Sequence, residues 1–137
     1  MHDARFTVCY VLFCLPSQRH ESAIWSLDIQ PDNHGFVTGG ADKTVKFWEF
    51  ELVADSANAG SSKRLSAVHV KTLKMADDVM CVKYSPDQKY LAVALLDTTV
   101  KVFFADTLKF YLSLYGHKLP VLTIDISKDS TLILTGT

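Results

Sequence analysis

Hydrophobic and polar residues alternate over several short stretches of the chain. Trp25, Leu27 and Ile29 are each separated by one polar residue, and the same period of two recurs at 45–47 and 112–114. This period, with β-branched and aromatic residues, is typical of strands that bury one face. The run Tyr90–Leu96 is apolar throughout and predicts a strand covered on both faces. No stretch sustains a helical period, so the pattern predicts an all-β protein.

Two stretches of the sequence repeat each other, and a third copy begins later. Pro31 and Pro86 each stand eleven positions before an Asp that opens the sequence Asp-x-Thr-Val-Lys. The third copy begins at Gly116-His117, and its Lys128 lies 42 positions after Pro86. A period of about 40–45 residues is that of a four-stranded repeat, so we expect sheets that stack on one another.

The first two copies are 55 residues apart, 13 more than the later pair. The extra residues fall at about 52–70, where 54–64 is mostly small and polar. Such a segment buries too little apolar area to offset the entropy of ordering it. We therefore expect an inserted loop at about 52–70 within a single repeat domain, residues 19–137.

Composition excludes several classes of protein. A net charge of −1 provides no overall field that would attract nucleic acid or a membrane. The cysteines lack metal-ligand spacing and indicate a reducing compartment, and His34 and His69 have no partner at ligand spacing. We expect no metal, no cofactor, no small-molecule substrate and no membrane association.

The repeats resemble those of the WD-repeat family, whose members are β-propellers built from four-stranded blades. The resemblance rests on the two Pro-Asp…Asp-x-Thr-Val-Lys copies, the first ending in Phe47-Trp48, and on Gly116-His117. It implies a partial WD-repeat β-propeller of about two and a half four-stranded blades. Because a ring usually needs about four to eight blades, we expect such a piece to expose strand edges and apolar faces.

The first copy contains a set of residues that could be either catalytic or structural: His20, Thr38, Asp42 and Trp48. Taken alone, a hydroxyl, an imidazole and a carboxylate suit a nucleophile, its base and an orienting group. In the WD-repeat family, however, residues of these types form a hydrogen-bonded tetrad that fixes strand packing. The resemblance therefore implies a structural tetrad with no catalytic residue, and we predict that the protein is not an enzyme.

The other copies keep fewer of these residues. The second retains only Asp97, and apolar residues take the other three positions: Met75, Val93 and Phe103. Replacing both partners of a buried hydrogen bond by apolar groups can be nearly neutral, so we expect an apolar-packed blade there. The third copy retains His117 and Thr135.

One charged stretch suggests a contact site. Between residues 56 and 76 the chain has four basic residues and no acidic one: Lys63, Arg64, Lys71 and Lys74. On a projecting loop they could contact RNA phosphates or an acidic partner. The alternative is a solvated loop without a binding role.

Residues 1–18 do not follow the repeats. The apolar run Phe6–Leu15 is too short to span a bilayer and lacks the flanking features of a signal peptide. We interpret this segment as an outer strand over 11–17 that leads into His20, or as the product of an incorrect gene start.

Longer segments narrow the resemblance. The stretches 35–53, 95–103 and 106–121 are similar to a tandem-propeller subunit of the small-subunit processome, over about residues 18–137. The similarity implies a non-enzymatic interaction scaffold in pre-rRNA processing, located in the nucleus and there in the nucleolus. Its partners would be other small-subunit processome proteins, with indirect or weak contact to pre-rRNA. An adaptor for another complex, such as one in signalling or substrate recruitment, is the alternative.

Overall fold

The computed structural model of the chain describes residues 18–54 and 63–137, and every regular element within them is a β-strand. The strands are β1 (Ile24–Ile29), β2 (Gly35–Gly40), β3 (Thr44–Ala54), β4 (Lys63–Lys74), β5 (Val79–Tyr84), β6 (Tyr90–Leu95), β7 (Val100–Phe104), β8 (Phe110–Leu114), β9 (Thr123–Ile126) and β10 (Ile133–Gly136). The all-β prediction is confirmed. In these described ranges no helix is long and apolar enough to cross a membrane.

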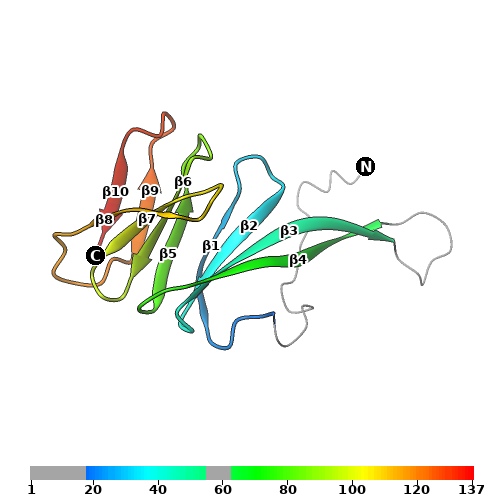
Figure 1. The fold of residues 1–137 in the computed structure, drawn as a ribbon, viewed down its shortest axis with the longest axis horizontal. Coiled ribbons are helices and arrows are strands. Elements are labelled where there is room, and N and C mark those ends of the chain that lie inside the picture. Colours follow the sequence, from blue (N-terminus) through cyan, green and yellow to red (C-terminus); the bar gives the residue numbers. More distant parts are fainter. Residues whose placement is uncertain (1–17, 55–62) are drawn as a thin grey trace, which may run out of the picture.

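The strands form three antiparallel sheets, each made of strands consecutive in sequence. The orders are β1-β2-β3-β4, β5-β6-β7-β8 and β9-β10, so each repeat in the sequence corresponds to one sheet. Figure 1 shows the sheets side by side in chain order. The second sheet lies in the middle, and its β5 contacts both β1 of the first sheet and β9 of the third.

The turns between the first two strands of the second and third sheets share one side-chain arrangement. The Ser85 hydroxyl donates to Asp87 Oδ1 at 2.6 Å and accepts from the Tyr90 N–H at 2.9 Å. Ser127 and Asp129 repeat this arrangement in the third sheet. One residue in this turn of each sheet has a positive φ: Asn33, Gln88 and Ser130. Local side-chain bonds therefore stabilise tight turns without glycine.

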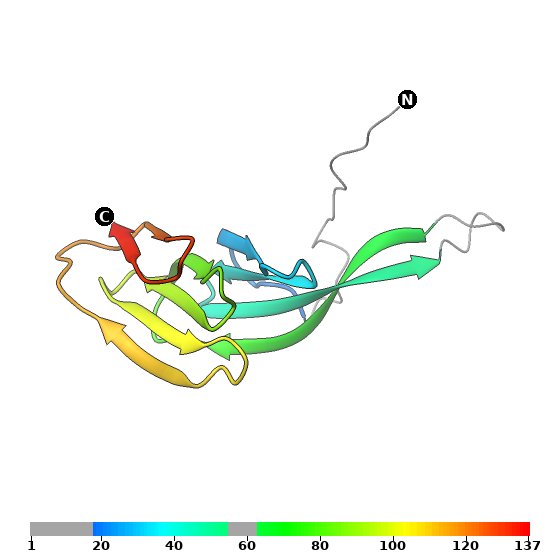
Figure 2. The same cartoon turned by 90° about the horizontal axis from the view of Figure 1, so that it is seen from above.

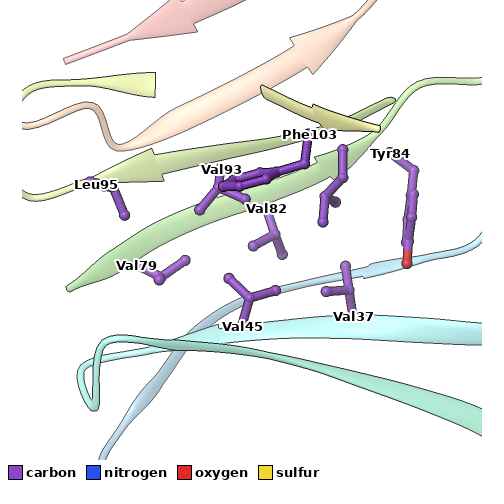
Figure 3. Packing of buried hydrophobic residues seen from close by; sticks show 9 residues of the cluster. Val37, Val45, Val79, Val82, Tyr84, Val93, Leu95 and Phe103 are labelled. Carbon is purple, nitrogen blue, oxygen red and sulfur yellow. The ribbon is translucent and has the colours of Figure 1, made fainter. Parts of the chain in front are cut away.

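The first and second sheets pack face to face through one cluster of buried apolar side chains. Figure 3 shows Val37 and Val45 of the first sheet facing Val79 and Val82 of β5. Gly39 on β2 allows this close approach, because a Cβ built there would lie 2.3 Å from Val79 Cγ1.

Strand β6 explains why the sequence has an uninterrupted apolar run. Leu91, Val93 and Leu95 are buried in the cluster against the first sheet. Ala92 and Ala94 belong to a second cluster that faces the third sheet and includes Val100, Val102, Val121 and Ile124. The prediction that this run is covered on both faces is confirmed for β6, whereas Leu96 lies beyond the strand and is 40% exposed.

The segment predicted to be an inserted loop at about 52–70 is mostly strand. The β3–β4 ladder continues through Leu52↔Leu65 to Ala54↔Lys63, and the hairpin extends beyond the other strands in Figure 1 and Figure 2. The loop prediction was wrong for 52–54 and 63–70, because cross-strand hydrogen bonds pair these residues and most of them lie outside the small and polar stretch 54–64. Residues 55–62 and the N-terminal segment 1–17, with its predicted outer strand, lie outside the described residues.

We predict that Gly39→Ala weakens the contact between the first two sheets. The added methyl overlaps a stiff β-branched side chain, and overpacking of this kind costs about 1–3 kcal/mol. Hydrogen exchange in the full-length protein should show faster exchange of β2 and β5 amides. Ser22→Ala, an exposed loop change, is the control, and unchanged protection in Gly39→Ala would contradict the prediction.

Candidate functional site

The four residues singled out in the first repeat lie within hydrogen-bond distance of one another. His20, in the segment before β1, places Nδ1 2.9 Å from each carboxylate oxygen of Asp42, in the β2–β3 turn. Its Nε2 lies 2.7 Å from Thr38 Oγ1 on β2. Trp48 Nε1, on β3, lies 2.9 Å from the same hydroxyl oxygen. Four separate segments of the first sheet therefore meet at one polar chain.

Donor and acceptor chemistry fixes the direction of the bonds at both ends of this chain. The Trp48 indole can only donate, so the Thr38 oxygen accepts from it. The Asp42 carboxylate accepts from His20 Nδ1, and the hydrogen bond between Thr38 Oγ1 and His20 Nε2 completes the chain. Thr38 is fully buried and its oxygen is bonded on both sides, so a substrate cannot reach it.

Asp42 is the end of the chain and accepts more bonds than His20 alone supplies. Burial raises the pKa of the Asp42 carboxyl, but hydrogen bonds from His20, Thr44 and the Glu21 N–H outweigh it and hold the pKa below its ordinary value of 3.8. The Thr44 hydroxyl donates at 2.7 Å and the Glu21 N–H at 3.0 Å. The carboxylate thus joins the segment before β1 to the β2–β3 turn.

The equivalent positions in the other sheets differ. Asp97 is exposed, and within the described residues it accepts hydrogen bonds from the Thr99 N–H and hydroxyl, across its own turn. Val93 and Phe103 are buried in the cluster between the first two sheets, and Met75 packs against it. In the third sheet, His117 Nε2 lies 2.7 Å from Thr135 Oγ1.

A second polar group, which the sequence reasoning missed, lies beside the first. Lys46 on β3 is 7% exposed, and its ammonium donates to Thr72 Oγ1 on β4 at 3.1 Å. Because lysine can only donate, the Thr72 O–H is available for His69 Nε2, 2.8 Å away. Burial, followed by the charge of Lys46, lowers the pKa of His69. The available signal was the Lys repeated in Thr-Val-Lys, since Lys101 contacts Ser113 similarly.

The basic residues predicted as one contact site are not brought together as a group. Lys71 pairs with Phe47 and Lys74 with Thr44, and both lysines are exposed. Successive side chains of a strand point to opposite faces, so an odd separation of three sends Lys71 and Lys74 to different faces. The side chains of Lys63 and Arg64 lie outside the described part of the structure.

The outer face of the first sheet exposes apolar side chains. Trp25, Leu27 and Ile29 of β1 are 57%, 60% and 51% exposed. In the second sheet, the residues at the Leu27 and Ile29 positions are Val82 and Tyr84, which are buried against the first sheet. The repeat therefore indicates that this face of β1 is a packing surface.

The described residues contain no group of three or more His, Cys, Asp or Glu side chains that could hold a metal ion. What they do contain is a series of four-stranded antiparallel sheets packed face to face, with an Asp-x-Thr turn between the second and third strands of the two complete ones. The first of these also carries the His–Thr–Asp–Trp chain. This combination defines a WD-repeat β-propeller, of which these sheets are successive blades.

The comparison with known families is more specific. The chain belongs to the family described as the WDR3 second beta-propeller domain, whose model matches residues 13–137. It is 64% identical over 102 residues to WD repeat-containing protein 3 of Mus musculus, covering 74% of this chain. It is 57% identical over 110 residues to U3 small nucleolar RNA-associated protein 12 of Saccharomyces cerevisiae, covering 77% of this chain. The chain spans 11–12% of the length of these curated relatives.

We predict that Thr38→Val destabilises the first sheet by about 1–3 kcal/mol for each buried group left unpaired, here His20 Nε2 and the Trp48 N–H. The triple variant His20→Met/Thr38→Val/Trp48→Phe, which copies the second sheet, should lose less than the sum of its single changes. Hydrogen exchange of β2 amides in the full-length protein measures each loss. Additive losses would contradict a coupled network.

We also predict that the contribution of Asp42 to stability disappears in acid. Because its pKa is lowered in the folded state, its stabilisation is complete above the ordinary pKa of 3.8 and declines as the pH falls below that value. Asp42→Asn should therefore be less stable than wild type at pH 7, with a smaller difference at pH 3. Exchange of β2 amides, corrected for intrinsic pH dependence, measures this. Asp97→Asn, on the exposed equivalent turn, should show a smaller loss at pH 7.

Proposed function

We propose that this chain is part of a β-propeller that acts as a non-enzymatic protein-interaction scaffold in small-subunit ribosome biogenesis. The observation that carries the proposal is the sequence identity to two relatives. It is 64% to WD repeat-containing protein 3 and 57% to the yeast U3 small nucleolar RNA-associated protein 12. The yeast protein is, by its name, associated with the U3 small nucleolar RNA. Under this proposal the chain works in the small-subunit processome, in the nucleolus, on pre-rRNA.

The geometry of the first sheet supports a scaffold over an enzyme. The hydroxyl that would be the nucleophile, Thr38, is fully buried and bonded to both His20 and Trp48. A catalytic hydroxyl needs access to its substrate, whereas a buried and satisfied network specifies one packing of strands. Under the scaffold proposal, Thr38 substitutions reduce folding stability and remove no turnover.

The test is affinity purification of the endogenously tagged full-length protein, followed by mass spectrometry of bound proteins and sequencing of bound RNA. Recovery of small-subunit processome proteins with pre-rRNA is the expected result. A preparation that contains a different, reproducible set of proteins would instead support an adaptor for another complex.

We predict that a Lys63→Gln/Arg64→Gln double variant weakens capture of RNA or an acidic partner and lowers its dependence on salt. Each phosphate contact that is lost reduces the salt slope by about one unit. Titration of the purified full-length protein against pre-rRNA at several salt concentrations measures this. Lys89→Gln/Lys109→Gln, two exposed changes elsewhere, is the matched control. If the affinity of both double variants depends on salt with the same slope, Lys63 and Arg64 do not take part in the proposed contact.

A further inference from the structure

A polar cavity of about 420 Å³ opens beside the His–Thr–Asp–Trp chain, at the end of the first sheet where β3 begins and β4 ends. Four basic side chains line it: Arg19, Lys43, Lys46 and Lys74. Two acidic residues, Glu21 and Asp42, also line it. The cavity therefore has more positive than negative groups on its walls.

Lys46 is the buried basic residue of this cavity. It is 7% exposed, yet among the described residues its ammonium has a single hydrogen-bond partner, the neutral Thr72 hydroxyl. No described carboxylate forms an ion pair with it. The ammonium opens onto the cavity, so two of its three N–H donors are available to an anionic or polar acceptor that enters it.

The neighbouring groups do not supply that acceptor. The Asp42 carboxylate already accepts bonds from His20, Thr44 and Glu21 N–H. Among the cations, Lys43 is paired with Asp77 at 3.7 Å. Arg19 and Lys74 are exposed and have no ion-pair partner in the described ranges. Lys46, Arg19 and Lys74 thus share a cavity whose two carboxylates are Asp42, which is already bonded, and the exposed Glu21.

The second sheet shows how the same lysine position is satisfied without a ligand. Lys101 Nζ contacts Ser113 Oγ at 3.3 Å and lies 5.8 Å from the centre of the Phe110 ring, which offers its negative face. In the first sheet the strand residue at the Phe110 position is His69, which pairs with Trp48. His69 turns its Nε2 to Thr72, and no aromatic ring within the described residues offers such a face to Lys46. Of the two complete sheets, the first has the more buried lysine and the second has the lysine with an aromatic ring beside it.

We propose that this cavity binds an acidic side chain, an Asp or Glu of a partner protein, between Lys46, Arg19 and Lys74. A single carboxylate matches one buried ammonium together with one planar guanidinium, which binds carboxylates in a bidentate manner. An RNA strand fits less well, because it needs an extended row of cations, while Glu21 lies on the rim and Lys71 lies on the other face of β4. The inference rests on the proposed scaffold role but not on its ribosomal setting.

The experiment uses complexes purified with the endogenously tagged full-length protein and a zero-length carbodiimide crosslinker. This reagent joins an amine to a carboxylate only when the two are in direct contact. Crosslinks from Lys46 or Lys74 to an Asp or Glu of another protein are the expected result. Complexes that contain abundant partners but give no such crosslink overturn the cavity proposal alone, and a preparation without any partner overturns the scaffold role as well.

Variants give an independent readout. Arg19→Gln/Lys74→Gln changes only exposed side chains and should reduce retention of the crosslinked partner about tenfold, as expected for removing partners of an interfacial carboxylate. Lys46→Met keeps the aliphatic stem and should have a similar effect, whereas Lys101→Met should have none. Wild-type retention in both cavity variants, or ultraviolet crosslinks from these residues to RNA in place of protein, would overturn the proposal.

Discussion

The structure depends on the burial of sheets against one another. A four-stranded sheet of this kind has an apolar surface on both sides, and neither side can remain in water without a cost. The second sheet meets this constraint through Leu91, Val93 and Leu95 on one face and Ala92 and Ala94 on the other. Larger side chains fill the space toward the first sheet, and the small alanines leave room for Val121 and Ile124.

Polar groups buried within the sheets are subject to the same constraint, because each needs a hydrogen-bond partner in place of water. A buried hydroxyl at Thr38 is compatible with packing only because Trp48 and His20 complete its hydrogen bonds and Asp42 completes those of His20. The second sheet meets the same requirement with Val93 and Phe103, which need no partners. The positions of His20, Thr38 and Trp48 are thus polar in the first sheet and apolar in the second, and each arrangement avoids an unpaired buried group.

Charge is balanced differently in neighbouring blades, and this difference separates a structural lysine from one available for binding. Lys101 is held by Ser113 and by the ring of Phe110. Lys46 has Thr72 and a His69 whose pKa is lowered by burial and by the lysine itself. The sequence Thr-Val-Lys is identical in the two repeats, so the distinction comes entirely from the strand that each lysine faces, β4 or β8.

The repeat spacing and the apolar period determined the all-β class and the correspondence of one repeat to one sheet, because these depend on local order along the sequence. The His20–Thr38–Asp42–Trp48 chain was expected from the resemblance to the WD-repeat family. Other features depended on partners distant in sequence. The ends of β3 and β4 have the composition of a loop, yet they form strands because cross-strand pairing supplies backbone hydrogen bonds that composition does not show. Strand pairing also sent Lys71 and Lys74 to opposite faces and brought Lys46 to Thr72, because the side of a sheet on which a residue lies is fixed only when its register is fixed.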